Sequence, residues 1–256
     1  MMNKLLNRVP EITLFFWVIK IMATTVGETA ADFLSFTMKL GLVNTSTVMS
    51  GLLVVALLIQ FKLKRYIPTA YWLVVVLISV VGTLITDNLV DNFHVSLVTI
   101  TALFSIALTA VFALWYASEK TLSIHSIVST KRESFYWAAI LFTFALGTAA
   151  GDLLAEHLGL GYAVSALIFG AIIAVITLAY YRFKLNAVLA FWMAYILTRP
   201  FGASIGDLLS QPVSAGGLGL GTVGTSGVFL ITIFGLITYF TIQQKKQVLI
   251  PQSDEK

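Results

Sequence analysis

The chain has 256 residues, of which 58% are hydrophobic and only 11% are charged, and its formal net charge is +4. With a mean hydropathy of +0.92, it carries more apolar surface than a water-soluble domain can cover, which excludes an ordinary soluble protein. The sequence contains no cysteine, which excludes disulfide bonds and thiolate metal sites.

Eight apolar stretches follow one another along the chain. Each approaches or exceeds the roughly 20 residues that a helix needs to cross about 30 Å of hydrocarbon. They are unbroken runs, unlike the alternating strands of a barrel, so we predict an all-α polytopic membrane protein with about eight transmembrane helices. The stretches cover residues 11–33, 47–61, 69–90, 95–117, 134–155, 160–181, 186–209 and 222–242.

Basic residues gather at the two termini and in the loops after the even-numbered stretches. Thirteen lysines and arginines lie there, and only Lys39 lies in the opposite loops. By the positive-inside rule this bias places both termini in the cytoplasm. It also accounts for the basic net charge without any nucleic-acid partner.

A repeated pattern begins each odd-numbered stretch. A tryptophan that follows another aromatic residue is succeeded ten residues later by a glycine, and five residues further on by an aspartate. The copies start 55, 65 and 55 residues apart, and the ten extra residues fall in the polar loop 118–133. The tryptophans are Trp17, Trp72, Trp137 and Trp192; the glycines are Gly27, Gly82, Gly147 and Gly202; the aspartates are Asp32, Asp87, Asp152 and Asp207.

The pattern divides one transmembrane domain, residues 1–256, into four two-helix repeats at about 10–66, 67–118, 133–184 and 185–244. The loop 118–133 joins two similar halves on the cytoplasmic side. Because each copy contains two helices, all four copies run in the same direction, so we expect parallel repeats around an axis near the bilayer normal.

The spacing sets the depth of the repeated residues. If each tryptophan lies at the membrane interface, the glycine is about 15 Å and the aspartate about 22 Å into the bilayer. Each glycine also begins a pair of small residues four apart, which lets helices approach closely in lipid. We therefore expect the odd-numbered helices to pack around the axis and the even-numbered helices to lie outside. The pairs are Gly27/Ala31, Gly82/Thr86, Gly147/Gly151 and Gly202/Gly206.

An ionised carboxylate that faces lipid carries a large free-energy cost, so the four aspartates must face the inside of the bundle. Glu28 lies one turn from Asp32, and together Glu28, Asp32, Asp87, Asp152 and Asp207 are the candidate cation-binding and metal-binding residues. Hard oxygen ligands of this kind suit magnesium, calcium, manganese or a proton. The alternative is that each aspartate is a buried structural joint between helices.

Further acids occur at the same spacing nearer the helix ends. Asp91 and Glu156 follow Asp87 and Asp152 by four residues, and we expect them in water at the outer rim. Gln211 replaces the acid in the fourth copy.

Two basic residues lie inside the predicted spans. Lys20 is only three residues past Trp17, and we expect it to extend to the cytoplasmic surface. Arg199 is deeper and precedes Pro200, which can kink a helix. It is either a counter-charge for a neighbouring acid or a gate that competes with a transported cation.

Other chemistry is not indicated. His94, His125 and His157 lack metal-ligand spacing, and the glycine-rich segment 216–221 lacks the remaining residues of a phosphate loop. No nucleophile and base pair is evident, so we expect neither an enzyme nor a cofactor.

The segments 26–34 and 147–154, with sequences VGETAADFL and GTAAGDLL, resemble a family of bacterial inner-membrane proteins made of four copies of a two-helix "repeat of unknown function". The likeness covers roughly residues 10–245. It implies a multi-pass protein of the bacterial inner (plasma) membrane, and some members of the family are linked to metal tolerance, including tolerance of aluminium or manganese. Thr86 and the Arg199-Pro200 pair depart from the pattern and argue against equal roles for the four sites.

The leading functional hypothesis is a transporter that exports a hard metal cation, manganese-like and divalent or aluminium-like and trivalent, through the carboxylate cluster. One alternative is a structural or assembly membrane protein whose carboxylates are structural. Another is a proton-coupled carrier of an organic solute. The expected partners are the lipid bilayer and a metal cation or proton, with Arg199 and Lys20 as charge partners or gates.

Overall fold

The computed structural model describes residues 7–249, and within this range the chain is helical and contains no strand. Eight helices are long and apolar enough to cross a membrane, which confirms the predicted fold class. Lys4 and Lys256, two of the terminal basic residues, lie outside the described range. The helices that begin the repeats are α2 (Leu14–Asp32), α4 (Pro68–Asp87), α6 (Thr130–Asp152) and α8 (Ala187–Ser210); those that end them are α3 (Leu42–Lys62), α5 (Leu97–Glu119), α7 (Tyr162–Phe183) and α9 (Gly221–Leu249).

The first helices of the repeats form a closed ring, in which α2 packs against α4, α4 against α6, α6 against α8, and α8 against α2. We call α2, α4, α6 and α8 the inner helices. More than half of the spanning part of each inner helix is buried, against at most 22% for the other four, which we call the outer helices. The expected arrangement of inner and outer helices is therefore present.

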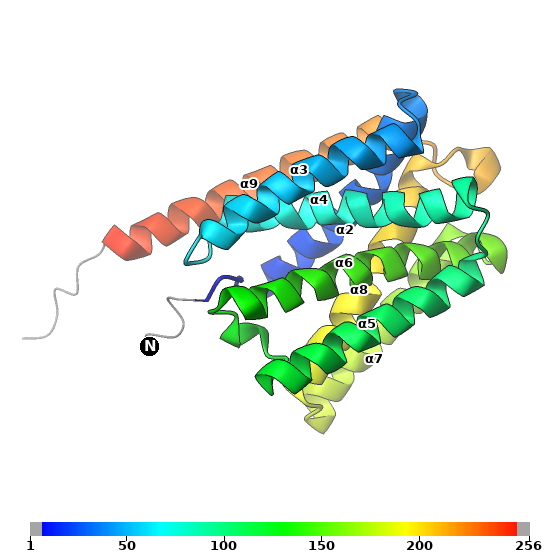
Figure 1. The fold of residues 1–256 in the computed structure, drawn as a ribbon. Coiled ribbons are helices and arrows are strands. Elements are labelled where there is room, and N and C mark those ends of the chain that lie inside the picture. The colour runs from blue at the N-terminus through cyan, green and yellow to red at the C-terminus, as the bar shows by residue number, and fades with distance from the viewer. Residues whose placement is uncertain (1–6, 250–256) are drawn as a thin grey trace, which may run out of the picture.

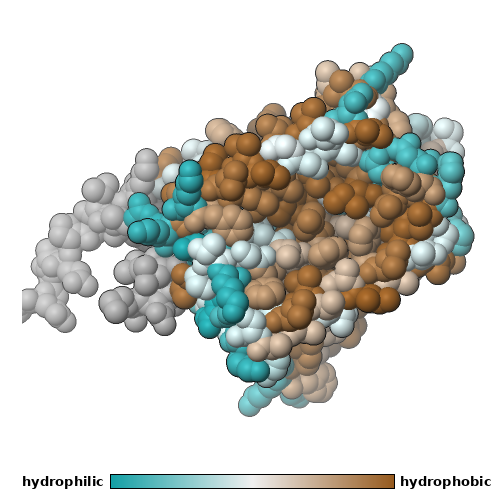
Figure 2. Space-filling model, viewed as in Figure 1, coloured by the Kyte–Doolittle hydropathy of each residue, from teal (hydrophilic) through white to brown (hydrophobic). Residues whose placement is uncertain are grey.

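Each outer helix packs mainly against the inner helix of the following repeat. Helix α3 lies on α4, α5 on α6, and α7 on α8, while α9 returns to lie on α2 and closes the circle (Figure 1). The face of the bundle seen in Figure 2 is covered mainly by hydrophobic side chains, and hydrophilic residues gather toward its two ends. Such a surface matches the hydrocarbon of a bilayer.

The two ends of the bundle differ in how the helices terminate. At one end, which we call the basic end, the inner helices begin and the outer helices finish. At the opposite, acidic end, three inner helices pass at their aspartates into a wider π turn, whereas α8 stays α-helical to Ser210. The turns are η1 (Phe33–Thr37), η2 (Asn88–Asn92) and η4 (Leu153–His157).

The polar start of α3 was missed by the hydropathy pattern, which placed it at residue 47 instead of Leu42. Ser46 and Thr47 donate side-chain hydrogen bonds to the carbonyls of Leu42 and Val43, one turn back. These bonds satisfy the hydroxyls within the helix, so polar residues are accommodated there.

A buried carboxylate holds the basic end together. Glu133, with no exposed surface, accepts hydrogen bonds from Arg8 at 2.5 Å, from Gln60 at 3.0 Å and from the Trp137 indole at 3.3 Å. It joins the segment before α2, the end of α3 and the start of α6. Sequence reasoning treated Arg8 only as a loop charge, because nothing in its neighbourhood shows which acid it meets.

Candidate functional site

One arginine side chain extends across the centre of the bundle. Arg199, on α8, is fully buried, and both of its terminal nitrogens lie 3.0 Å from Oε2 of Glu28 on α2. Glu28 is 6% exposed, so this ion pair is almost excluded from solvent. In such surroundings, removing one partner leaves the charge of the other buried and unpaired, which destabilises the fold by several kcal/mol.

The arginine also reaches the two remaining inner helices. It donates to the hydroxyl of Thr148 at 2.7 Å and to the hydroxyl of Thr83, which in turn donates to Glu28 at 3.3 Å. Glu28, Thr83 and Thr148 each follow the repeat tryptophan by eleven residues. The fourth residue of this set is Ala203, in the repeat that supplies Arg199. All four repeats therefore contribute to one polar layer across the axis.

The repeated glycines make room for that layer. Each glycine faces the residue that lies seven positions after the tryptophan of the next repeat around the ring. A β-carbon on Gly82 would lie 2.8 Å from Cβ of Phe144, and one on Gly202 would lie 2.8 Å from Thr24. Gly27 meets Ser79 and Gly147 meets Arg199 even more closely. The second set of glycines is looser: a β-carbon on Gly151 or Gly206 would make only ordinary contacts of 3.4 Å or more.

Lys20 is buried, and the expectation that it extends to the surface is wrong. Its side chain has no exposed area, and its Nζ donates to the carbonyl of Tyr195 at 2.7 Å and to the hydroxyl of Thr198. The same nitrogen lies 4.3 Å from the centre of the Tyr195 ring and 5.4 Å from that of Phe144. An aromatic face and two oxygen acceptors replace water around the ammonium group.

Aromatic rings fill the axis between Lys20 and the basic end. The residues that precede the repeat tryptophans meet there, and the hydroxyls of Tyr71 and Tyr136 are 2.5 Å apart. Phe16 lies 6.1 Å from Phe191 and 6.3 Å from Tyr195, measured between ring centres. This half of the axis is therefore closed by packed rings.

The repeated aspartates lie on the other side of the arginine layer, toward the acidic end. Asp32, Asp87 and Asp152 are half-buried, and Asp207 is 7% exposed. Each of the four interacts electrostatically with Glu28, so Glu28 and the aspartates influence one another's charge. Their only hydrogen bond to another side chain within residues 7–249 joins Gln211 to Asp32 at 3.3 Å.

The carboxylates do not form a ready-made metal site. Among the residues that the structure describes, no three acidic or histidine side chains converge as the ligands of one metal ion. Of the rim acids, Glu156 accepts a hydrogen bond from the Tyr162 hydroxyl at 3.1 Å, and Asp91 is exposed. A cation held here would require the acids to move closer together or to keep water ligands between them.

Sequence reasoning identified the acids and Arg199 but not the hydroxyls that complete the layer. Thr83 and Thr148 occupy the same repeat position as Glu28. An alignment of the four copies therefore shows polar residues at this position in three of them, which predicts that their side chains meet. The π turns next to the aspartates had no signal of this kind, because the repeat spacing does not distinguish a π turn from the end of an α-helix.

Four parallel two-helix units, closed into a ring with polar residues on its axis, define a multi-pass helical membrane protein. Each unit matches the family described as Repeat of Unknown Function (DUF347), at residues 15–66, 70–121, 135–186 and 190–246, and the chain belongs to that family. No curated protein and no solved structure matches the chain.

Proposed function

We propose that this protein is a membrane transporter, an exporter of a hard metal cation such as a manganese-like divalent or aluminium-like trivalent ion. Its pathway follows the axis of the four inner helices. The observation that supports this is the Arg199–Glu28 pair, which lies between a half of the axis lined by carboxylates and a half filled by aromatic rings. An ion pair at this boundary occupies the place where a closed gate is needed.

The charge balance favours a cation as the transported species. Five carboxylates surround this part of the axis, and among the described residues Glu28 is the only one of them that forms a salt bridge. The four aspartates are left with a large desolvation cost if all are ionised. A bound cation removes this cost, and carboxylate oxygens are the ligands that hard cations prefer.

Arg199 then acts as an internal competitor of the cation. A cation that reaches Glu28 weakens the pair, and the displaced guanidinium moves away from the layer. Its Nε atom is buried without a hydrogen-bond partner in the described range, so its present position is not fully satisfied. Pro200 deprives the preceding turn of a backbone donor, so the backbone hydrogen bonding of α8 is weakened beside Arg199.

The basic end is then the cytoplasmic end, because positively charged loops are retained there. In a bacterial inner membrane, this orientation puts the half of the axis that is filled by aromatic rings on the cytoplasmic side. The aspartates then lie toward the outside. An exporter would therefore release its cation through the carboxylate-lined half.

The test is cation flux into vesicles that contain the purified full-length protein. A panel of hard cations is compared for the parent, Asp32→Asn and Asp152→Asn, with Asp91→Asn as a control at the exposed rim. We expect saturable flux that both inner variants lose and the rim variant keeps. Absence of flux with every cation, together with poorly folded inner variants, would favour the structural alternative.

A second candidate is a proton-coupled carrier of an organic solute. It is favoured by the lack of three converging carboxylates among residues 7–249, since protons need no common coordination sphere. Collapse of a pH gradient in the same vesicles, without any metal, distinguishes it from the metal exporter.

A further inference from the structure

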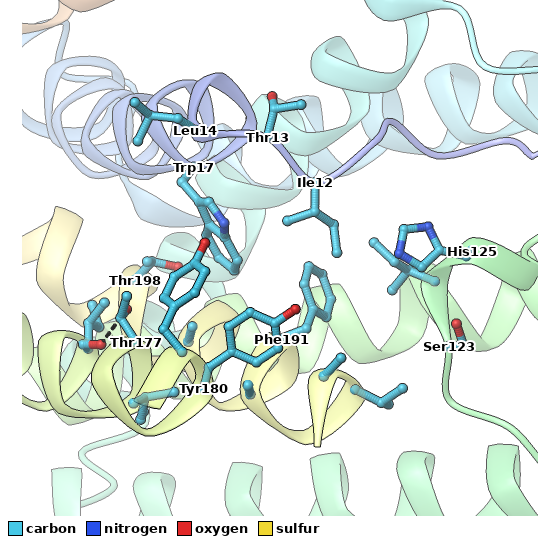
Figure 3. A pocket seen from close by; sticks show the side chains of 18 of the residues that line it. Ile12, Thr13, Leu14, Trp17, Ser123, His125, Thr177, Tyr180, Phe191 and Thr198 are labelled. Atoms are coloured by element: carbon cyan, nitrogen blue, oxygen red, sulfur yellow. Dashed lines mark hydrogen bonds between the residues drawn. The ribbon is translucent and has the colours of Figure 1, made fainter. Parts of the chain in front are cut away.

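A cavity of about 660 Å³ lies away from the axis, at the basic end, between α2 on one side and α7 and α8 on the other. Its walls are mainly apolar, and the loop between the two halves of the chain contributes part of one wall, including His125. Figure 3 shows Trp17 extending from α2 toward the rings of Tyr180 and Phe191. Cavities of roughly 300–1,000 Å³ are typical of small-molecule sites.

The cavity lies at the depth of one bilayer leaflet. Along α7 it extends from Ile173 to Tyr181, which corresponds to about 12 Å of helix. A leaflet contributes about 15 Å of hydrocarbon, so a ligand that enters from the membrane is an amphiphile whose apolar part fills the space.

Trp17 differs from its three repeat counterparts in a way that points to a ligand. Trp72, Trp137 and Trp192 are only 3–4% exposed, whereas Trp17 is half-buried and faces the cavity. The indole of Trp137 donates to Glu133, and that of Trp192 donates to the carbonyl of Leu122. The Trp17 N–H has no acceptor in the part of the chain that the structure describes. A ligand with an oxygen acceptor would satisfy it.

A basic residue lies next to the cavity, on the side of the basic end. A smaller hollow that shares Tyr180, Tyr181 and Ala187 with the cavity is lined by Lys184 and Asn186. Lys184 is exposed, and it follows the end of α7 with a left-handed backbone. The arrangement is an apolar chamber, then a hydrogen-bond donor, then a cation, in order from the membrane interior to the basic end.

We propose that this cavity binds an anionic glycerophospholipid from the leaflet at the basic end. An acyl chain occupies the apolar chamber, an ester carbonyl accepts the hydrogen bond of Trp17, and the phosphate lies beside Lys184. The site exists at the junction of α8 and α2, where the chain closes its ring, so the lipid contacts both the first and the last repeat.

The test uses phospholipids with brominated acyl chains, which quench nearby tryptophans. Brominated phosphatidylglycerol and brominated phosphatidylcholine are titrated separately into the full-length protein in mixed micelles. The difference between the parent and Trp17→Phe isolates the signal of Trp17. We expect Trp17 to be quenched at a lower concentration by phosphatidylglycerol, by about fivefold, which is the contribution of one basic residue near an anionic headgroup.

Two variants examine the two halves of the site. Lys184→Gln should remove the preference for phosphatidylglycerol, and it should weaken quenching by phosphatidylcholine less than quenching by phosphatidylglycerol. Thr177→Phe, at an exposed position in the chamber wall, should weaken quenching of Trp17 by both lipids. Leu167→Phe is the matched control, since Leu167 is 72% exposed on the same helix and lies outside the cavity.

The outcomes separate a specific site from ordinary contact with the bilayer. Equal quenching of Trp17 by both lipids in the parent, or unchanged quenching in Thr177→Phe, would overturn the proposal. A folded Lys184→Gln variant that keeps the full preference would overturn the placement of the phosphate.

Discussion

The guanidinium of Arg199 is held by side chains from the other three repeats, so its energetics depend on all of them at once. Its pair with Glu28 is nearly excluded from water. The pair itself contributes little net stability, because desolvation offsets most of the attraction. Removal of one partner is a different matter, since it leaves an uncompensated buried charge.

We therefore predict that Glu28→Gln lowers the free energy of unfolding by about 3 kcal/mol or more, and that the double variant Glu28→Gln/Arg199→Gln recovers most of that loss. The measurement is denaturation of the purified protein in mixed micelles, followed by the fluorescence of its tryptophans. A double variant as unstable as the sum of the two single variants would show that the pair is not the source of the effect. In that case the hydroxyls of Thr83 and Thr148 would be the main partners of Arg199.

Lys20 and Arg199 show which part of a site a single sequence predicts. The repeat places both at known depths, and for Arg199 the alternatives included a counter-charge on a neighbouring helix, which Glu28 provides. For Lys20 the prediction of an extended, surface-seeking side chain was wrong. Its acceptors, the carbonyl of Tyr195 and the hydroxyl of Thr198, come from a helix 175 residues later in the chain. Nothing local to Lys20 encodes them.

At the scale of the helices, the repeated glycines differ in how closely the neighbouring helix approaches them. Gly147 lies against the first side-chain carbons of Arg199, in closer contact than a β-carbon allows. A β-carbon on Gly151, one turn later on α6, would have its nearest neighbour at 3.8 Å. The sequence pattern assigned both to helix packing, because spacing alone does not show how closely the opposite helix approaches.

This difference predicts opposite results for two matched substitutions. Gly147→Ala should destabilise the protein by about 1–3 kcal/mol, because α6 and α8 must separate and displace Arg199. Gly151→Ala should be neutral or stabilising by about 0.5–1 kcal/mol, since alanine favours the helix and meets no obstacle. Unfolding of both variants in the same micelles provides the comparison. Equal destabilisation would mean that the second glycine contact is also tight.

Helix ends were the least predictable feature at this scale. The number of helices and their direction followed from the apolar runs and the repeat. The π turns after Asp32, Asp87 and Asp152 did not, because neither an apolar run nor the repeat spacing distinguishes a π turn from the end of an α-helix. The absence of such a turn after Asp207 adds to the differences between the fourth repeat and the others.

In the whole molecule, each repeat is incomplete by itself because its outer helix packs on the inner helix of the next repeat. The arrangement forms a circle only because α9 returns to α2. The hydroxyls of Thr29 on α2 and Ser226 on α9 are 2.6 Å apart, and the rings of Phe15 and Phe240 are in contact at 5.2 Å. An alternative closure, in which α9 packs on α2 of a second molecule, would bury the same side chains in a dimer.

The two closures are distinguished by cross-linking, which the absence of native cysteine makes straightforward. Thr29→Cys/Ser226→Cys should form a disulfide on oxidation, because the two hydroxyls already lie within the reach of such a bond. We expect the product to migrate as a monomer on a denaturing gel. The control is Thr29→Cys/Ser46→Cys: Ser46 is the counterpart of Ser226 on α3, but it accepts a hydrogen bond from Asn88 of η2, the turn that follows α4, so it should not cross-link with residue 29. A dimer-sized product from the first pair would show that the ring closes between molecules. Cross-linking of the control pair would show that α3 packs within its own repeat, and the order of helices around the axis would then be wrong.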